Sequence, residues 1–537
     1  ETTQPFRADP AHCKFLADRF VEGECSICHD LGARGDQCDA CGGLLDPFEP
    51  EREPSNEDDD HVEAKATGWL INPRCKVDGT APEKRRTKHL YLRLDAIKDL
   101  LVPWFHKSSK EGDWSANCIS ITQAWIDKGL LPRGITRDLK WGVPIPKGLD
   151  GLSDEEYAEK VFYVWFDACI GYVSITKNLT DPGNLDGTNW EKWWRNPEEV
   201  SLFQFLGKDN VQFHSCVFPA SQIGTGKKWT QVNKISATEY LNYEGGKFSK
   251  SRGVGVFGNN AKDTGIDPDI WRFYLLSRRP ETADSEFKWE EFIDINNNDL
   301  LKNVGNLVQR TLKFCAAKMD STVAASDYTD EVIEAHKKSA REVLASYIEH
   351  MEATKMRAAV ADIMTYSSLG NKFLQDNKLD GRLLTEEPAR CNAVISIALS
   401  HIHLLAGLLF PYMPGKSEAI LKQLGLPEAS PSISETWSFD SLPAGHRIGT
   451  PGPLFAVIPA AKAEEWREAY GGEELKRQKA IAAEKAAAKK LKKQQDKDKK
   501  KQKKQEAAAA AGAADDALAP GVAKLSVEGG DKPEGKQ

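Results

Sequence analysis

Four cysteines near the N-terminus are the feature that most constrains how this chain folds. They stand in "ECSICHDLGARGDQCDACGG" as Cys25-x2-Cys28 and Cys38-x2-Cys41, with nine residues between the two pairs. Two such pairs on a short loop deliver four thiolates to one tetrahedral site, and zinc is the metal that suits this ligand set. A redox role for a C-x-x-C pair is the alternative, and the presence of two matched pairs disfavours it.

A zinc ion held by four protein thiolates has no open position, so we expect a structural role. Such a site contributes on the order of 10–16 kcal/mol of folding free energy in small zinc peptides. The stretch "NPRCKVDG" hints at another knuckle, but it holds Cys75 alone, with Asp78 where a second thiol would stand. We therefore assign one metal, and whether Cys75 contributes to a site stays open. Eleven cysteines in 537 residues do not form a disulfide scaffold and favour a reducing compartment.

The length predicts about three domains rather than one core. No apolar run reaches the ~18 residues that a membrane span requires. The first ten residues, "ETTQPFRADP", lack a basic region, an apolar region and an initiator methionine. We therefore expect no secretory signal and a processed or partial product.

The charge is distributed unevenly. The chain carries a net charge of −8, yet residues 476–504 hold 14 Lys/Arg against 3 Asp/Glu, which is +11 and leaves −19 for the rest. An acidic body with a basic arm indicates that the arm meets a polyanion. A merely solubilising charge run is the alternative. The last ~30 residues have the composition of a disordered tail.

The texture of the sequence changes along the chain. Residues 117–130 have an amphipathic helical pattern. The runs "VFYVWFDA" (161–168) and "SLFQFLG" (201–207) are typical of buried parallel strands, and the segments between them are long enough for helical crossovers, so we expect an α/β sheet. From about 268 to 425 the apolar period is helical, which predicts an all-α module. We expect "GTPGPLFAVI" (449–458) to pack back on those helices.

One polar loop, "NYEGGKFSKSRG" (242–253), carries two lysines three residues apart behind two glycines. A solvated turn is the plain interpretation, and a phosphate clamp is the other. The neighbouring "GVGVFG" matches G-x-G-x-x-G, but it follows a polar loop rather than a strand and opens no βαβ unit, so we exclude a dinucleotide site. The polar residues Lys208, Asp209 and His214 follow one predicted strand, and Asp167 ends the other. Ligand sites of open α/β sheets lie beyond such strand ends, although Trp165, Tyr172 and His214 could equally be core residues.

Several blocks together resemble one family. "KFSKS" (247–251) resembles the KMSKS motif of the class I aminoacyl-tRNA synthetases, with Phe for Met. "ITRDLKWGVPIP", "VFYVWFDACIGY", "FLGKDNVQFHS" and "GIDPDIWRFYLL" resemble blocks of the eukaryotic-type cytoplasmic methionyl-tRNA synthetases in the expected order, as does the four-cysteine knuckle. The resemblance reaches from the N-terminus to about residue 425. It implies a cytoplasmic ligase that joins methionine to its tRNA through a methionyl-adenylate, with ATP and Mg²⁺, for translation initiation and elongation.

The resemblance also implies a fold and its division. It is the C-terminal half of a Rossmann-like α/β catalytic fold with a zinc-knuckle insertion, followed by an α-helical anticodon-binding bundle and a basic, partly disordered tail. The expected parts are listed here in order: the insertion at 1–132, the catalytic half at 133–235, a stem-contact region with the KFSKS loop at 236–295, the anticodon-binding domain at 296–465, and the arm and tail at 466–537.

The resemblance assigns roles to individual residues. The catalytic charges are Lys247 and Lys250, on a loop hinged at Gly245 and Gly246. The ATP site comprises Lys247, Ser249, Lys250, Gly207, Asp209 and Arg137. The methionine pocket comprises Trp165, Ala168, Tyr172, Asn210, His214 and Phe218. Asn306 and Arg310, one helical turn apart, would read the anticodon, although a solvated helix face gives the same pattern. Cys169 stands where many relatives have Pro, and the tryptophan that stacks on an anticodon base in many relatives is not evident in "QDNKLDGR".

The HIGH-type motif of class I synthetases does not occur in the sequence. We therefore expect roughly 100 or more residues of family sequence to be absent from the front, and no ATP–pyrophosphate exchange by the isolated chain. Two alternatives follow. One is a non-catalytic tRNA-binding or scaffolding protein, which the intact lysine loop disfavours. The other is a synthetase for leucine, isoleucine or valine, which the single knuckle and short insertion disfavour. Partner proteins and oligomeric state are not readable from the sequence.

Overall fold

The computed structural model describes ten segments and two further residues, 477 and 495. The segments are 2–7, 14–17, 20–35, 38, 41, 43, 45–49, 68–183, 188–427 and 433–473. Most of the predicted acidic spacer (49–60) lies outside these residues, as do the basic arm and the tail apart from 477 and 495.

The chain divides into two compact units. The larger comprises Glu1–Gly246 and Thr264–Ile458, and the smaller comprises Lys247–Asp263 and Pro459–Gln537. The smaller unit thus contains both the lysine loop and the segment that begins at Pro459. The sequence assigns the loop and this segment to different domains. Each unit is described by itself.

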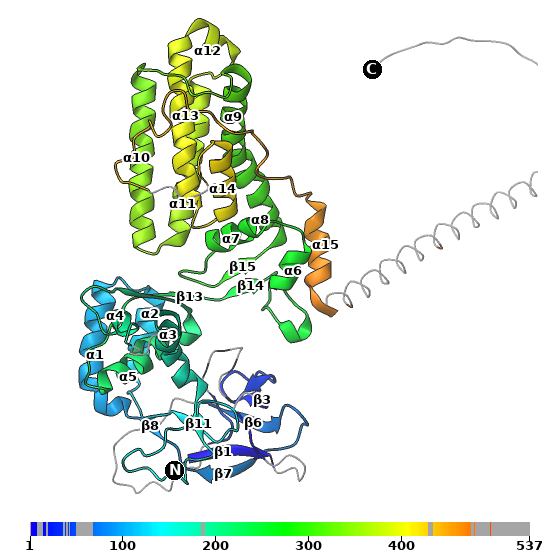
Figure 1. The fold of residues 1–537 in the computed structure, drawn as a ribbon. Helices are drawn as coiled ribbons and strands as arrows, with labels where there is room; N and C mark the ends of the chain where they lie inside the picture. Colours follow the sequence, from blue (N-terminus) through cyan, green and yellow to red (C-terminus); the bar gives the residue numbers. More distant parts are fainter. Residues whose placement is uncertain are drawn as a thin grey trace, which may run out of the picture. The chain divides into compact units, whose positions relative to one another are not determined.

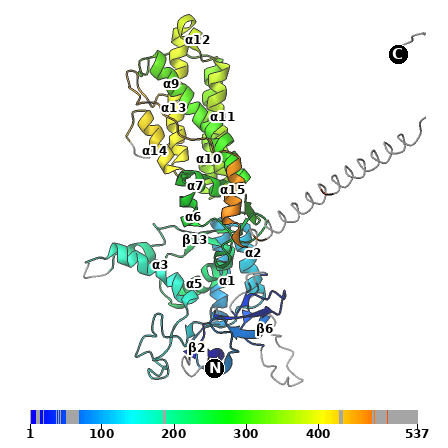
Figure 2. The same cartoon turned by 90° about the vertical axis from the view of Figure 1, so that its right-hand side faces the viewer.

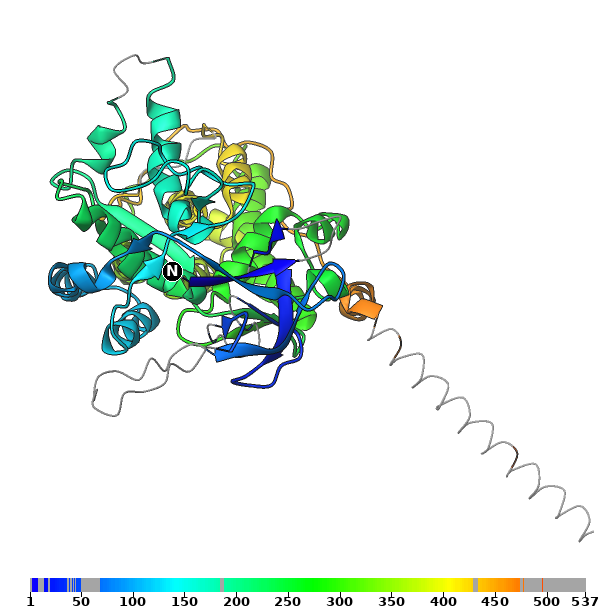
Figure 3. The same cartoon turned by 90° about the horizontal axis from the view of Figure 1, so that it is seen from below.

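Short strands build the cysteine-rich part of the larger unit. Strand β1 (Thr2–Arg7) pairs antiparallel with β2 (Lys14–Phe15) and β7 (Glu83–Thr87), and β1 and β7 lie side by side near the N-terminus (Figures 1 and 3). A second sheet has the order β4-β3-β6-β5. Its strands are β3 (Val21–Cys25), β4 (Ala33–Arg34), β5 (Leu45–Asp46) and β6 (Gly68–Cys75). The buried core is small and consists of Leu16, Val21, Cys25, Ala33, Cys38, Leu45, Leu70 and Cys75.

A parallel strand pair confirms the α/β prediction. Strand β12 (Leu202–Gly207) pairs with β13 (Val232–Thr238), and the crossover between them is helical. It contains η2 (Lys208–Asn210), the π-helical turn η3 (Phe213–Val217) and α5 (Phe218–Gly224). The predicted amphipathic helix is α2 (Ala116–Asp127), which follows α1 (Leu94–Glu111). Residues of α1, α2, α5 and β13 share one core, which therefore crosses the predicted boundary at 132/133.

The prediction of a strand over 161–168 is wrong. Strand β11 (Val161–Phe162) is short and pairs antiparallel with β10 (Thr136–Arg137), and helix α3 (Val164–Thr180) begins two residues later. Short apolar runs fit a buried strand or a helix equally well, and here the apolar residues continue to the length of a helix. The run 201–207 is a strand as predicted, but it is not buried throughout, since Phe203 and Phe205 are exposed.

Aromatic side chains form the core beyond β13. Strand β14 (Leu241–Tyr243) pairs in parallel with β15 (Ser285–Phe287), and helices α7 (Pro268–Ser277) and α8 (Trp289–Asp294) pack nearby. Trp289 is fully buried and its indole N–H donates to the Tyr243 hydroxyl at 2.8 Å. Trp271 packs against Phe292 with ring centroids 4.3 Å apart. Two further short strand pairs lie before β12 in the sequence: β8 (Tyr91–Leu92) with β9 (Arg133–Gly134), and β10 with β11. The short helix α4 (Glu191–Trp194) precedes β12.

The predicted all-α module begins at residue 289 rather than at about 268, because strand β15 (Ser285–Phe287) interrupts the predicted helical run and pairs with β14. Its long helices run alongside one another (Figures 1 and 2). The module's elements are η5 (Ile295–Gly305, π-helical), α9 (Asn306–Lys318), α10 (Glu331–Glu352), α11 (Met356–Asp376), α12 (Gly381–Glu386), α13 (Pro388–Leu409) and α14 (Pro414–Gln423). The return segment packs on the helices as expected, because Asn296 donates to the Ala456 carbonyl at 2.9 Å. The sequence did not indicate the next helix, α15 (Ala461–Tyr470), as separate from the arm.

Helix α13 is the one described helix whose length and apolar composition match a membrane span. Of its most apolar window, 83% is buried inside the fold. It is therefore the central helix of the module.

Buried histidines make this module sensitive to acid. His336 stacks on Phe373 and lies beside His401, which stacks on Tyr366. Burial lowers the pKa of His336 to about 4 and the pKa of His401 well below its ordinary value. In the unfolded chain these two histidines take up protons below about pH 6.5. In the folded module they stay neutral until the pH approaches their lowered pKa values.

We accordingly expect stability to fall as the pH drops from about 6.5 to 4. His336 alone accounts for about 3 kcal/mol of this loss at the acid end. His336→Phe keeps the stacked ring without the proton site and should flatten the pH dependence of the unfolding transition in calorimetry. His106→Phe, at an exposed histidine, is the control and should leave the dependence unchanged.

Candidate functional site

The structure brings the four predicted zinc ligands together. All four sulfur atoms lie within 4.8 Å of one another. Cys25 Sγ lies 3.9 Å from Cys41 Sγ, and Cys28 Sγ lies 3.6 Å from Cys38 Sγ. These distances bracket the ~3.8 Å edge of a tetrahedron with Zn–S bonds of ~2.3 Å. The donor set and its spacing therefore fit a zinc ion.

Cys75 and Asp78, the residues that hinted at a second zinc knuckle, make other interactions in the structure. Cys75 is buried in the core of the module. Asp78 accepts hydrogen bonds from the hydroxyl and the amide of Thr80 at 2.8 and 3.2 Å, and it pairs with Arg7 at 2.5 Å. The Thr80 hydroxyl is the main reason why the pKa of Asp78 falls to about 2. The carboxylate thus stabilises a turn of the protein.

The residues predicted to bind methionine lie mostly along one face of α3, opposite η3. Trp165 packs edge-on against Phe213 with ring centroids 5.1 Å apart, and Tyr172 lies 6.4 Å from Phe218. Ala168 lies between Trp165 and Tyr172 on the same face of α3, because positions i, i+3 and i+7 of a helix share a face. Ala168 is exposed. A small exposed residue therefore lies between two aromatic side chains on this face.

His214 joins the two sides of this cluster. Its Nδ1 lies 2.8 Å from the carbonyl oxygen of Asn210, which can only accept, so Nδ1 carries the proton. Its Nε2 then accepts from the Tyr172 hydroxyl at 2.9 Å. Burial lowers the pKa of His214, which favours this neutral ring at pH 7. The result is a tyrosine whose hydroxyl direction is fixed. Asn210 contributes through its backbone, since its side chain is exposed.

Arg137 lies at the other end of the cluster. Its guanidinium stands 4.1 Å from the centre of the Tyr163 ring, and that ring lies 5.4 Å from Trp165. Gly207 ends β12, and Asp209 follows in η2 with its carboxylate close to the Gly207 Cα, where an added Cβ would meet it at 2.7 Å. A side chain at position 207 would therefore displace the Asp209 carboxylate.

Sequence reasoning missed the partners of Lys208. Its ammonium pairs with Glu239 at 2.5 Å and with Asp284 at 3.0 Å. Burial opposes the charge, but these two hydrogen bonds outweigh it and raise the pKa of Lys208. Phe213 was missed as well. The available signals were an acidic residue directly after β13 and an aromatic residue next to His214.

The lysine loop belongs to the smaller unit. Lys247 and Lys250 are exposed, and Lys250 begins a short helical turn, η4 (Lys250–Arg252). Ser249 accepts a hydrogen bond from Arg252 Nε at 3.1 Å. The predicted hinge coincides with the boundary between the units, which falls between Gly246 and Lys247. Gly245 has a φ of +82°, which glycine adopts without strain.

The predicted anticodon residues lie at the start of α9. Asn306 donates to the side-chain oxygen of Asn371 on α11 at 2.8 Å, which fixes its orientation. Asn371 in turn donates to the carbonyl of Asn303 at 2.9 Å. Arg310 is exposed one turn further along α9. One held amide and one exposed guanidinium therefore share a helix face.

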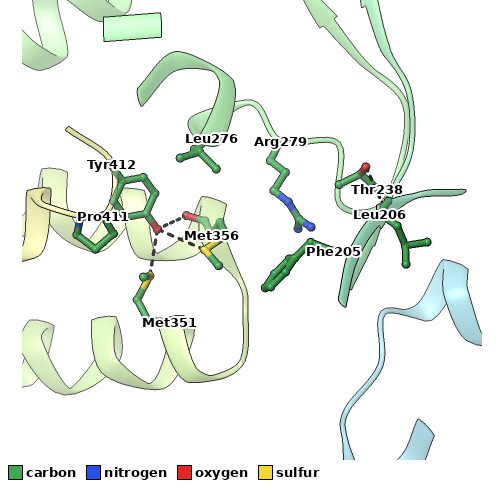
Figure 4. A pocket seen from close by; sticks show the side chains of 9 residues that line it. All are labelled: Phe205, Leu206, Thr238, Leu276, Arg279, Met351, Met356, Pro411 and Tyr412. Atoms are coloured by element: carbon green, nitrogen blue, oxygen red, sulfur yellow. Dashed lines mark hydrogen bonds between the residues drawn. The ribbon is translucent and has the colours of Figure 1, made fainter. Parts of the chain in front are cut away.

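A separate apolar pocket contains none of the predicted site residues. Figure 4 shows its side chains, with Arg279 and Phe205 on one side and Tyr412 on the other. Its volume is about 490 Å³. The Tyr412 hydroxyl donates to the Met356 carbonyl at 3.1 Å. The pocket lies where β12 and β13 approach α7, α11 and the end of α13.

A comparison with known families identifies the class of protein. The family model described as "tRNA synthetases class I (M)" matches residues 2–312, more than half of the chain. The chain belongs to this family of class I tRNA synthetases. Residues 324–475, which follow α9 and include the helices from α10 to α15, match a second model, "Anticodon binding domain of methionyl tRNA ligase". Both models place the chain in the methionyl branch, as the sequence motifs predicted.

Curated relatives agree with this assignment. A probable cytoplasmic methionine–tRNA ligase of Schizosaccharomyces pombe is 49% identical over 86% of this chain and 55% of its own length. The cytoplasmic methionine–tRNA ligase of Saccharomyces cerevisiae is 46% identical over 87% and 57%. The human cytoplasmic enzyme is 44% identical over 89% and 49%. The chain thus spans about half the length of the curated relatives it matches.

A solved structure shares the fold. The methionyl-tRNA synthetase of Mycobacterium tuberculosis in complex with methionyl-adenylate superposes with a TM-score of 0.58 at 23% identity, covering 72% of each chain. The predicted fold class is therefore confirmed: an α/β catalytic region of class I type, with a cysteine cluster that suits zinc, followed by a helical anticodon domain.

Proposed function

We propose that this protein joins L-methionine to its cognate tRNA, using ATP and a methionyl-adenylate intermediate. The observation that carries this proposal is the cluster on α3, where Trp165 and Tyr172 flank Ala168 and His214 fixes the tyrosine. An unbranched thioether fits a gap beside a small residue and packs well against aromatic rings. Phe218 lines the far side of Tyr172.

The adenylate step requires positive charge where pyrophosphate leaves, and little covalent chemistry. We propose that Lys247 and Lys250 supply this charge, with Ser249 as a hydroxyl donor. Gly207 ends β12 and Asp209 follows it, at the strand end where ligands of α/β sheets bind. Arg137 would meet the reacting carboxylate and phosphate region. Mg²⁺ would accompany ATP.

The helical module is proposed to read the anticodon. Asn306 is oriented by Asn371, and Arg310 is exposed beside it. An amide and a guanidinium one turn apart suit the edges of unstacked bases. We further propose cytoplasmic location, as the names of the relatives state for those proteins. We also propose the domain boundaries given by the sequence, except at 132/133, where one core spans the boundary. The zinc ion would hold the N-terminal module in its fold.

Binding of tRNA by the purified chain tests the tRNA assignment without requiring catalysis. The chain should bind methionine tRNA at least about tenfold more tightly than the same tRNA with a changed anticodon. Arg310→Gln should remove most of that difference. Lys313→Gln, at an exposed lysine one turn along α9, is the matched control and should retain it. Equal affinity of the wild type for both tRNAs would contradict the assignment.

The basic arm is proposed to bind RNA phosphates without sequence preference. Deleting residues 476–504 should weaken tRNA binding at low salt and flatten the plot of log affinity against log salt, because fewer counterions are released. Binding titrations over a salt series measure both effects. A variant of equal length with glutamine for lysine should behave like the deletion. An unchanged slope would refute the assignment.

A further inference from the structure

The lysine loop is bonded to the segment that follows α15. The amide of Gly255 donates to the carbonyl oxygen of Tyr470 at 2.9 Å, and Val254 and Gly471 form an antiparallel bridge. The Tyr470 hydroxyl donates to the carbonyl of Asn260 in helix α6 (Gly258–Asp263) at 3.3 Å. Figure 1 shows α15 beside α6. Two segments about 200 residues apart in sequence therefore share backbone hydrogen bonds.

The fit at this contact requires glycine. Gly472 has a φ of +79°, and a Cβ added there would lie 2.7 Å from Val254 Cγ2 and 2.9 Å from the carbonyl oxygen of Arg252. Contacts this short force the backbone apart. Both the conformation and the closeness thus exclude a side chain at position 472.

Val254 and Gly255, which pair with the C-terminal segment, also determine the conformation of the lysine loop. Ser249 and Val254 exchange two backbone hydrogen bonds, of 2.8 and 3.0 Å, which close a hairpin with Lys250 at its tip. The ring of Phe248 lies against Gly255, where an added Cβ would meet it at 2.2 Å. Fixing Val254 and Gly255 therefore fixes the backbone that carries Lys250.

We propose that residues 470–472 form a backbone clamp that positions the lysine loop for ATP. Two observations support this reading. The loop belongs to the compact unit that contains the C-terminal segment, and glycines with positive φ, Gly245 and Gly265, stand at its two connections to the other unit. Within this unit, Tyr470 and Gly471 are the residues of the C-terminal segment that pair with the backbone of the loop. The role in ATP binding rests on the proposed function, whereas the clamp itself does not.

Hydrogen exchange in the purified chain tests the clamp directly. In Gly472→Ala the amide of Gly255 should exchange about tenfold faster or more than in the wild type, because its acceptor, the carbonyl oxygen of Tyr470, is displaced. Gly445→Ala is the matched control, since Gly445 also has a positive φ (+84°) but an added Cβ meets nothing within 4 Å. Unchanged exchange of the Gly255 amide in Gly472→Ala would overturn the proposal.

Kinetics of the protein purified from its native cells test the positioning role. Gly472→Ala should raise the KM for ATP in methionine-dependent exchange about tenfold and leave the KM for methionine unchanged. Gly445→Ala, which lies outside the clamp, should behave almost as the wild type. An unchanged KM for ATP would overturn the positioning role. Failure of the wild type to support exchange would overturn the proposed function instead, and the exchange of the Gly255 amide is measured independently of it.

Discussion

Replacing Cys28 with serine is expected to release the zinc ion and unfold the N-terminal module. Binding of structural zinc contributes on the order of 10–16 kcal/mol, which exceeds the stability of most whole domains, at about 5–15 kcal/mol. The module's small core cannot replace this, because Cys25 and Cys38 are themselves part of it. Metal analysis of the purified chain should give about one zinc per wild-type chain and none for Cys28→Ser.

Cys75→Ser is the matched control for this experiment. Cys75 is buried in the same core but does not belong to the four-sulfur cluster. This variant should keep its zinc and lose only the ~1–3 kcal/mol that follows from placing a hydroxyl in an apolar core. Zinc retained by Cys28→Ser, or lost equally from both variants, would contradict the assignment of the site. The helical module should keep its own unfolding transition in either variant.

Removing either lysine of the loop is expected to slow adenylate formation strongly. One preorganised charge at a leaving group is worth roughly 2–4 kcal/mol in the transition state, which corresponds to about 30- to 1,000-fold in rate. Lys247→Ala and Lys250→Ala, made in the native gene, should each lower the rate of methionine-dependent ATP–pyrophosphate exchange by a factor in this range. Methionine binding should not change, because the α3 cluster is untouched.

Lys262→Ala provides the comparison for the two loop variants. Lys262 is an exposed lysine on α6 in the same compact unit. Its removal changes the net charge equally and should alter the exchange rate less than about twofold, since a distant exposed charge is screened by salt. If all three variants behave alike, the loop lysines act only through overall charge and the phosphate-clamp role is wrong.

The features that could be predicted from the sequence are those set by residues close together in the chain. The cysteine pairs placed four sulfurs together because each C-x2-C turn is short, and the run at 201–207 formed β12. The run at 161–168 misled because an apolar stretch has no period that separates a strand from a buried helix. Only the further apolar residues up to Tyr172 indicate α3.

Contacts between distant segments could not be predicted from the residues alone. The hydrogen bond between Tyr172 and His214 joins a helix to a π-helical turn 42 residues away. The clamp at Tyr470 uses backbone atoms, which every residue has, so its sole trace in the sequence is the pair of glycines that follows. The family motifs indicated which residues belong to the site, whereas the structure shows which of these residues contact one another.

The amino-acid dependence of ATP–pyrophosphate exchange, measured on the protein purified from its native cells, tests the central claim most directly. The cluster of Trp165, Ala168, Tyr172 and His214 predicts exchange with methionine and none above background with leucine, isoleucine or valine. Exchange driven by one of those three amino acids, or no exchange with any of them or with methionine, would contradict the account.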